Sequence, residues 1–551
     1  MKAKKFSLFL VMILALSTFL AACSGGDEDA NGNEGDGSKE KAEQVLNLAE
    51  TSEIPSMDST LATDQVSFNV MNNVMEGLYR LGEDDKVVPG VADGDPTVSE
   101  DGKTYTIKLR QDAKWSNGDP VTANDFVYAW QKAVNPDTGA EYAYMLFVIE
   151  NAEEINSGKK KVEDLGVKAL DDYTLEVKLK NAIPYFQSLL VFGTFMPQNQ
   201  KFVEAQGEKF GLEADTTLYN GPFTLSEWKH EESFTLSKND QYWDKETVKL
   251  DKVNFKIVKD SNTRVNLYET GKIDRVALTA EHVDNYKDSE EFLTESDTSV
   301  YFMRLNQKNK ALKNVNIRKA IDMAYDKQAL VDNLLNNGSV PAHYLVPSDF
   351  VKGPDGKDFR DVNGDMNVTN KEEAKKLWET GLKEIGETKV TLQLLNYDSD
   401  NAKKIGEYIK EQLETTLPGL TVELKQQPFK QKLELETKGD YDLSYAGWGP
   451  DYQDPMTFLD MFVTDGAHNQ MDYSNPEYDK LIQEAGSTLL SDLPARWETL
   501  QKAEKILIEQ DAAISPLYQQ GLSFLMKDKV KNLYSHAFGG DYSYKWVSIE
   551  E

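Results

Sequence analysis

The chain contains a single cysteine among 551 residues, and it has no long apolar run beyond its first 20 residues. Because Cys23 has no second thiol to pair with, no disulfide can form, and the folded part must be stabilised by a hydrophobic core. No second apolar stretch is long enough to cross a bilayer, so we expect the rest of the chain to be water-soluble. The length is sufficient for about two to four domains or lobes.

Basic residues are also scarce relative to acidic ones. There are 61 Lys and Arg against 93 Asp and Glu, which gives a formal net charge of −32. A surface of that sign repels phosphate backbones and anionic lipid headgroups. Nucleic-acid binding is therefore not expected.

Histidine is rare, and the sequence marks of common enzymes are missing. None of the histidines has a His or Cys partner at metal-ligand spacing, so no metal or cofactor is predicted. The chain has no G-x-S-x-G, no G-x-x-x-x-G-K-[ST] and no H-E-x-x-H motif. We predict a protein that is not an enzyme, with a hydrolase built on a carboxylate pair as the alternative. The histidines are His230, His282, His343, His468 and His536.

One acidic segment resembles a calcium-binding loop. Its oxygen-bearing residues fall at alternate positions, but Met366 stands where the turn normally requires glycine. The alternative is a loop that ends by capping a helix over 371–382, with Asn370 or Thr369 as the cap, and this interpretation is favoured. The oxygen-bearing residues are Asp361, Asn363, Asp365, Asn367, Thr369 and Glu372.

The N-terminal residues carry the pattern of an export signal. Three lysines precede an apolar run over 6–20, and Leu20-Ala21-Ala22-Cys23-Ser24 follows. This pattern resembles a bacterial lipobox, which predicts a signal peptide over 1–22 and a lipid on Cys23. An ordinary secretory signal that happens to contain a cysteine is the alternative. Residues 24–41 are rich in Gly, Asn and acids, so we interpret 23–44 as a flexible tether.

Beyond the tether, two kinds of apolar periodicity alternate. Alternating apolar residues predict strands over 104–109, 173–179, 233–238 and 252–258, whereas helical spacing appears over 314–335 and 494–510. The chain is therefore predicted to be a mixed α/β protein. Turn-rich breaks occur near 81–95, 197–217 and 513–516, and none resembles a disordered linker, which favours lobes connected by several chain crossings.

The segment 440–462 contains the strongest candidate site. A strand-like run stops at Gly447-Trp448-Gly449-Pro450, and Asp451 follows directly. The two glycines permit close approach of another backbone, and Pro450 ends the strand. Asp451 is then well placed to meet a cation that docks against the exposed strand edge. The alternative is a turn whose aspartate only caps a helix beginning near Met456.

At these motifs the chain resembles a known family, the large extracytoplasmic solute-binding proteins of peptide ABC importers, and most closely the oligopeptide-binding proteins. The resemblance extends over nearly all of the chain after the tether. The lipobox and tether are similar to those of members anchored on the outer face of the cytoplasmic membrane in bacteria with a single membrane. The most similar segments are 109–136, 162–179, 219–243 and 446–459.

The resemblance implies a periplasmic-binding-protein-like α/β fold with two lobes, a hinge and a smaller domain inserted in the first lobe. Lobe I would comprise 45–80, 197–299 and 515–551. The inserted domain would be 81–196, and lobe II would be 300–514.

The resemblance also implies a function, which is the capture of short peptides in extended conformation and their delivery to the permease subunits of an ABC importer, by a monomer. Asp451 would accept the free α-ammonium of the peptide, and Gly447 and Gly449 would offer backbone groups. Other solutes, such as a dipeptide, a murein peptide or a signalling peptide, are alternatives on the same scaffold. Further ligand contacts are expected from Trp448, Tyr445, Phe429 and Tyr397.

The sequence departs from the family at one part of the site. Some members hold the peptide's carboxyl terminus with an arginine and a histidine, and the matching positions here are Tyr445 and Ala402. Lys403 or Lys404 is an alternative cation. The preferred ligand length therefore stays open.

Overall fold

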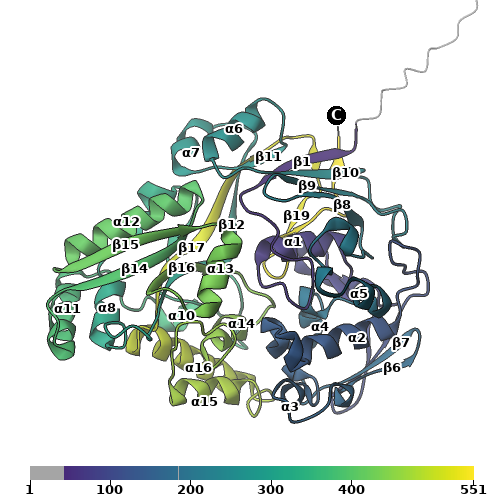
Figure 1. The fold of residues 1–551 in the computed structure, drawn as a ribbon, viewed down its shortest axis with the longest axis horizontal. Helices are drawn as coiled ribbons and strands as arrows, with labels where there is room; N and C mark the ends of the chain where they lie inside the picture. The colour runs from purple at the N-terminus through teal and green to yellow at the C-terminus, as the bar shows by residue number, and fades with distance from the viewer. Residues whose placement is uncertain (1–42, 184, 551) are drawn as a thin grey trace, which may run out of the picture. The chain divides into compact units, whose positions relative to one another are not determined.

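The computed structural model describes residues 43–183 and 185–550 (Figure 1). Residues from Glu43 onward form one compact unit. The predicted signal peptide, Cys23 and nearly all of the predicted tether lie outside the described residues. Helices and strands alternate along the chain, which confirms the predicted mixed α/β class.

One four-stranded sheet combines the first strand of the described chain with three strands from residues 223–257. Its order is β1 (Val45–Glu50), β10 (Lys252–Ile257), β9 (Ser233–Lys238) and β8 (Phe223–Lys229). β1 pairs parallel to β10, and the other pairs are antiparallel. The alternating burial along β9 and β10 confirms the two strands that were predicted there.

A second four-stranded sheet lies entirely within residues 97–178. Its order is β4 (Thr97–Val98), β5 (Thr104–Lys108), β7 (Thr174–Lys178) and β6 (Val167–Asp171), all antiparallel. Helix α2 (Ala123–Val134) packs against it and contributes to the local core. The strands predicted over 104–109 and 173–179 are confirmed.

The third sheet has seven strands, and two long strands connect its parts. The first half of β12 pairs with β17 beside β11, and its second half pairs with both β17 and β16. The β12–β17 register shifts between Ser296 and Val300, so the chain bulges there. The order is β11 (Arg275–Ala277), β17 (Ile514–Met526), β12 (Phe292–Leu305), β16 (Leu443–Trp448), β14 (Val390–Tyr397) and β15 (Leu420–Gln427), with β13 (Val340–Pro341) paired to β17.

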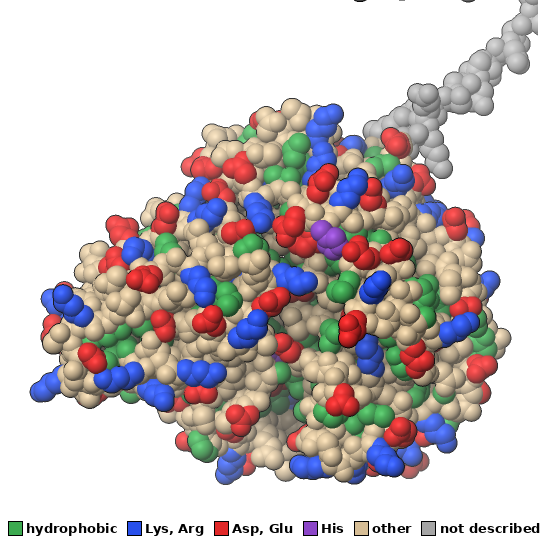
Figure 2. All heavy atoms as spheres, viewed as in Figure 1, with side chains coloured by type: hydrophobic (Ala, Val, Ile, Leu, Met, Phe, Trp, Pro, Cys, Tyr) green, Lys and Arg blue, Asp and Glu red, His purple; other side chains and the backbone are tan. Residues whose placement is uncertain are grey.

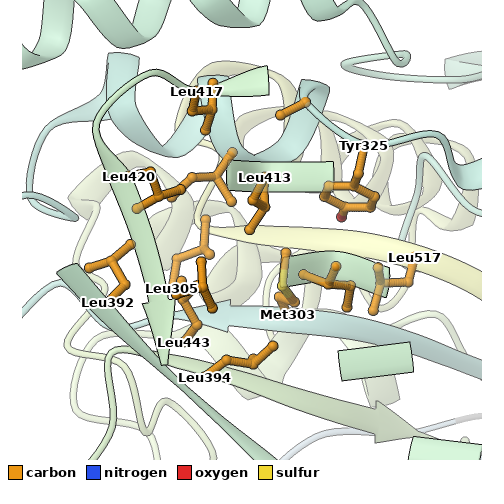
Figure 3. Close-up of a cluster of buried hydrophobic side chains, with 14 of the residues drawn as sticks. Met303, Leu305, Tyr325, Leu392, Leu394, Leu413, Leu417, Leu420, Leu443 and Leu517 are labelled. Atoms are coloured by element: carbon orange, nitrogen blue, oxygen red, sulfur yellow. The ribbon is translucent and has the colours of Figure 1, made fainter. Parts of the chain in front are cut away.

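Helices α8 (Val315–Met323), α11 (Lys371–Ile385) and α12 (Asp400–Thr416) cover this sheet (Figure 1). Leucines from β12, β14 and β16 meet Leu413 and Leu417 at the α12 end in a cluster of buried side chains (Figure 3). This close-packed cluster holds β14 and β16 rigidly in place. The strand ends that follow are therefore fixed in position.

The predicted helical stretch 314–335 is divided in the structure. α8 ends at Met323, and α9 (Lys327–Ala329) and the helical turn η8 (Leu330–Leu335) follow. The break occurs because the Asp326 side chain accepts a hydrogen bond from the Ala329 amide and starts a new helix. The stretch predicted over 494–510 is continuous, as α16 (Leu493–Lys505) and η10 (Ile506–Gln510).

The remaining elements are short and surround these sheets. They are α1 (Gln65–Val74), α3 (Ala152–Asn156), α4 (Phe186–Leu189), α5 (Gln200–Gln206), α6 (Ser261–Glu269), α7 (Ala280–Tyr286), α10 (Arg360–Asn363), α13 (Phe429–Lys438), α14 (Met456–Leu459) and α15 (Pro476–Ala485). Two-stranded pairs are formed by β2 (Tyr79–Leu81) with β3 (Val87–Pro89), β18 (Val530–Lys531) with β21 (Ser548–Ile549), and β19 (Tyr534–Ser535) with β20 (Tyr542–Ser543).

Acidic and basic side chains are interspersed over the face seen in Figure 2, without a continuous patch of either sign. The excess of negative charge is therefore not concentrated on this face.

In the described part of the chain, no helix has both the length and the apolar character that a membrane span requires.

Candidate ligand-binding site

The segment singled out in the sequence lies at a cavity of about 230 Å³. The wall combines the end of β16, the start of α13, the end of β14 and the 3-10 helix η3 (Glu141–Val148). Every predicted ligand-binding residue except Tyr445 lines it. These are Asp451, Trp448, Gly447, Gly449, Phe429 and Tyr397.

The end of β16 has one unpaired edge. On one side it pairs with β12 as far as Trp448, but on the other it pairs with β14 only at Leu443 and Ser444. Backbone groups beyond Ser444 on that side therefore have no neighbouring strand in the described chain. An extended ligand can pair with such an edge as an added strand.

The two glycines of this strand make room for the cavity wall. A Cβ atom on Gly447 would lie 2.8 Å from the Tyr301 ring, and one on Gly449 would lie 3.0 Å from Ser299 Oγ. Tyr301 faces Gly447 across the β12–β16 pair and itself lines the cavity. Glycine at position 447 thus allows Tyr301 to pack against the strand.

Asp451 is a buried carboxylate without a charged partner. Its side chain is 5 % exposed. Oδ1 accepts one long hydrogen bond of 3.4 Å from the Tyr142 hydroxyl, and Oδ2 has no partner. Among the described residues, no lysine, arginine or histidine forms an ion pair with it. A buried charge in this state is costly, which is the condition that a cationic ligand relieves.

The electrostatics of the cavity reflect that absence. Burial raises the pKa of Asp451 well above its usual range, repulsion from Asp460 adds to this effect, and the hydrogen bond from Tyr142 opposes it. The nearby His468 is neutral, because burial lowers its pKa to about 3. His468 therefore supplies no positive charge to Asp451.

The Asp451 carboxylate does not cap the helix that follows it. Helix α14 has Pro455 at its N-cap position and no side-chain cap. Asp454 Oδ1 accepts from the Met456 amide at 3.0 Å, and the same carboxylate forms two hydrogen bonds of 2.8 Å with the Arg496 guanidinium. The Asp451 backbone amide donates to Thr457 Oγ1, and its carboxylate is left available for a ligand.

Residues from far along the chain cover Asp451. The Tyr142 ring stacks on Trp448 with a centroid separation of 6.3 Å and meets His468 at 4.9 Å. Tyr185 stacks on Tyr452 at 5.6 Å. These contacts join residues 141–185 to residues 448–468 and exclude water from the carboxylate. No sequence motif marked Tyr142, which lies just beyond the similar segment 109–136.

Tyr445 lies behind the cavity wall. Its hydroxyl is 2.5 Å from the Tyr518 hydroxyl, and its ring stacks on Tyr301 with centroids 5.4 Å apart. Ala402 belongs to α12 and faces the buried core, away from the cavity. Lys404 forms surface ion pairs with Glu281 and Asp400, at 3.2 and 3.6 Å. Neither alternative lysine lines the cavity.

The cations that do line the cavity were not found from the sequence. Lys432 Nζ contacts Glu436 at 2.7 Å and donates to the Tyr397 hydroxyl at 3.2 Å, and burial lowers its pKa to about 8. Arg304 donates to the His468 carbonyl at 2.7 Å. Lys432 follows Phe429 by one turn of α13, so helical spacing was the only available signal.

The segment that resembles a calcium loop is used structurally. Asn363 donates to the Gln501 carbonyl at 2.8 Å, Asn367 to the Ile508 carbonyl at 2.7 Å, and Thr369 to the Tyr325 carbonyl at 2.9 Å. Asn370 caps α11 by accepting from the Glu373 amide, as the favoured interpretation predicted. Among the described residues, no group of three His, Cys, Asp or Glu side chains is arranged to hold a metal.

A mixed α/β protein with a cavity, an unpaired strand edge and a buried carboxylate that lacks an ion-pair partner has the character of a ligand-binding protein. Residues 86–470 match the model of the bacterial extracellular solute-binding proteins, family 5 (middle). The chain belongs to this family, whose members are solute-binding proteins of the two-lobed α/β type.

Similar proteins support this assignment over nearly the whole chain. The chain is 38 % identical to the dipeptide-binding protein DppE of Bacillus subtilis over 96 % of both sequences. It matches the substrate-binding domain of an oligopeptide ABC transporter from Bacillus anthracis with 51 % identity and a TM-score of 0.91, covering 93 % of this chain and 99 % of that one. It also matches Listeria monocytogenes OppA bound to peptide, with 48 % identity, a TM-score of 0.90, and 93 % and 100 % coverage.

Proposed function

We propose that this protein captures short peptides that have a free amino terminus and delivers them to the permease of an ABC importer. The observation that carries the proposal is Asp451, a buried carboxylate whose Oδ2 has no partner and which forms no ion pair with any described residue. The two cations in the same wall, Lys432 and Arg304, lie beside Glu436 instead. The names of similar proteins, a dipeptide-binding protein and an OppA solved with peptide, support the same ligand class.

The physical basis is the cost of burying Asp451. When the cavity closes, the carboxylate loses water and is penalised unless a cation meets it. The α-ammonium of a peptide removes that penalty, and the resulting charge-assisted hydrogen bond is worth about 1.5–3 kcal/mol. Peptide binding therefore favours the closed form, which is the form we expect the permease to recognise.

The unpaired edge of β16 explains how many different peptides could be accepted. Backbone groups from Tyr445 to Trp448 can pair with an extended peptide whatever its side chains are. The α-ammonium would fix the register, and the strand edge would supply the remaining affinity. Low side-chain selectivity along this edge follows.

We also propose the cellular setting that the sequence predicted. A lipid on Cys23 would hold the protein at the outer face of the cytoplasmic membrane, and residues 23–44 would act as a tether. The protein would act as a monomer without catalysis, and lobe boundaries near residues 80, 197, 300 and 515 remain our predicted division. Membership of a solute-binding family supports the non-enzymatic role.

The test of peptide capture is calorimetry on Asp451→Asn with matched free and N-acetylated tetrapeptides. The native protein should bind the free peptide far more tightly than the N-acetylated one. Asp451→Asn should weaken binding of the free peptide by roughly tenfold to a hundredfold and should change the affinity for the acetylated peptide little. Asp440→Asn is the matched control, because Asp440 belongs to the same segment but is exposed. Equal affinities of native protein and Asp451→Asn for free peptide would refute the proposal. Recovery of intact peptide afterwards separates a receptor from a hydrolase.

A further inference from the structure

The cavity at Asp451 adjoins a second and larger one. This second cavity has a volume of about 540 Å³ and lies beneath β1, β11 and the C-terminal segment. The two share part of their walls, which we call the junction. The junction consists of Gln65, Asp297, Tyr301, Gln520 and Asp541.

Some of the other charged side chains around the two cavities have partners of opposite charge. Glu436 is 2.7 Å from Lys432, and Glu295 is 3.9 Å from Arg275. Glu50, Asp64 and Glu141 also line the cavities and form no ion pair with any residue that the structure describes. Acidic side chains outnumber basic ones in the combined walls. The surplus includes the two acids of the junction.

Asp297 and Asp541 are held only by neutral donors. Asp297 accepts from the Ser299 amide at 2.7 Å and from Gln520 Nε2 at 3.2 Å. Asp541 accepts from Gln65 Nε2 and from Asn69 Nδ2. Neither carboxylate forms an ion pair with any residue that the structure describes. By contrast, the buried Asp454 is fully paired with Arg496.

The electrostatics of the junction agree with that geometry. Burial raises the pKa of Asp541 to about 7, and repulsion from Asp297 adds to the effect. Burial also raises the pKa of Asp297. Two carboxylates held close together without a cation favour any ligand that brings a positive charge.

We propose that Asp297 and Asp541 form a second cation subsite, which binds the side-chain ammonium or guanidinium of a lysine or arginine within the peptide ligand. The proposal rests on the function proposed above, because the junction is part of the same wall as the unpartnered oxygen of Asp451. A peptide anchored by its amino terminus at Asp451 extends past the junction toward the larger cavity. The protein would therefore favour peptides with a basic residue after the first.

The test is calorimetry with alanine tetrapeptides in which lysine, norleucine or glutamate is placed at the second, third or fourth position. Norleucine matches the length of the lysine stem but carries no charge. At one or more positions, lysine should bind at least on the order of tenfold more tightly than norleucine, and glutamate should bind more weakly than both. The advantage should shrink as the pH falls through about 7, because Asp541 then becomes protonated.

Substitutions locate the effect. The double variant Asp297→Asn/Asp541→Asn should lose the lysine advantage and keep its affinity for the norleucine peptides, which also shows that it is folded. Glu295→Gln is the matched control, because Glu295 lies in the wall of the larger cavity beside Arg275, and it should keep the lysine advantage.

The following outcomes would contradict the proposed second subsite. If norleucine peptides bind and lysine gives no advantage at any position, the subsite does not exist, although the proposed function stands. If the advantage survives the double variant, or disappears equally in Glu295→Gln, the junction is not its source. If no peptide binds at all, both proposals fail.

Discussion

At the scale of single residues, the site depends on which aspartates have partners. Asp451, Asp454 and Asp460 lie within ten residues of one another, yet only Asp454 meets an arginine. Asp460 accepts from the Tyr452 hydroxyl at 3.2 Å, and its Oδ1 has no partner. The fold thus keeps the buried Asp451 and the half-buried Asp460 without charged partners near the ligand cavity at a cost to stability, as ligand sites often do.

Asp460 gives a prediction for stability against pH. Burial raises its pKa to about 8, whereas the unfolded chain has the ordinary value of 3.8. The folded state therefore holds the proton more tightly, and stability decreases as the pH rises from about 4 to about 8. Asp460→Asn should remove this loss, gaining up to about 4 kcal/mol relative to the native protein between pH 5 and pH 8, at about 1.4 kcal/mol for each pH unit.

Urea unfolding of the ligand-free native protein and of Asp460→Asn at pH 5 and pH 8 measures the difference in the free energy of unfolding. Asp440→Asn, an exposed position, should not change with pH in this way. A native-minus-variant difference that stays constant between the two pH values would contradict the assigned role of Asp460.

At the scale of elements, β16 positions the site. The leucine core fixes its first half, and its second half keeps one free edge because β14 separates from it after Ser444. On the other edge of β16, Gly447 leaves room for Tyr301 of β12, which is stacked on Tyr445 and Tyr518. Tyr445, which the sequence predicted to contact the ligand, therefore lies behind the cavity wall and supports Tyr301.

The two glycines of β16 provide a graded prediction. In Gly447→Ala the new Cβ would lie 2.8 Å from a ring that is held by two other rings, whereas in Gly449→Ala it would lie 3.0 Å from the small Ser299 hydroxyl. We expect Gly447→Ala to weaken peptide binding by roughly tenfold or more, and Gly449→Ala to weaken it less. Calorimetry with one neutral tetrapeptide compares them. The reverse order would mean that the packing of Tyr301 does not shape the cavity.

At the scale of the whole molecule, the site is assembled from segments that are distant in the sequence. Asp451 is covered by residues 141–185, and the junction joins residues near 65, 297, 520 and 541. The chain crosses repeatedly between its sheets, most clearly through the long pair β12 and β17. Any motion that separates these segments would open the cavity, which is how ligand exchange is expected to occur.

The anchoring proposal is also tested at this scale. When the full chain is expressed in a bacterium with a single membrane, the native protein should sediment with membranes, and Cys23→Ser should be released into the medium. Intact mass measurement of the extracted protein should show a lipid only in the native form. Equal membrane retention of both proteins, or an unmodified native mass, would contradict the lipid anchor.

Much of the fold was predictable because local patterns dictate local structure. The alternation of apolar residues correctly indicated β5, β7, β9 and β10, and the cap at Asn370 correctly marked the start of α11. The division of the helix after Met323 was not predicted, because an aspartate at position 326 is equally compatible with a surface position inside a helix and with a helix cap.

The sequence alone determined the family, the export pattern at the N-terminus and the segment that contains Asp451, since each depends on residues that are adjacent in the chain. Only the tertiary structure decided that Asp451 lacks a partner while Asp454 has one, that Tyr142 covers Asp451, and that Asp297 and Asp541 line the same junction. Charge pairing and burial depend on distances in space, and residues hundreds of positions apart carry no local pattern that reveals them.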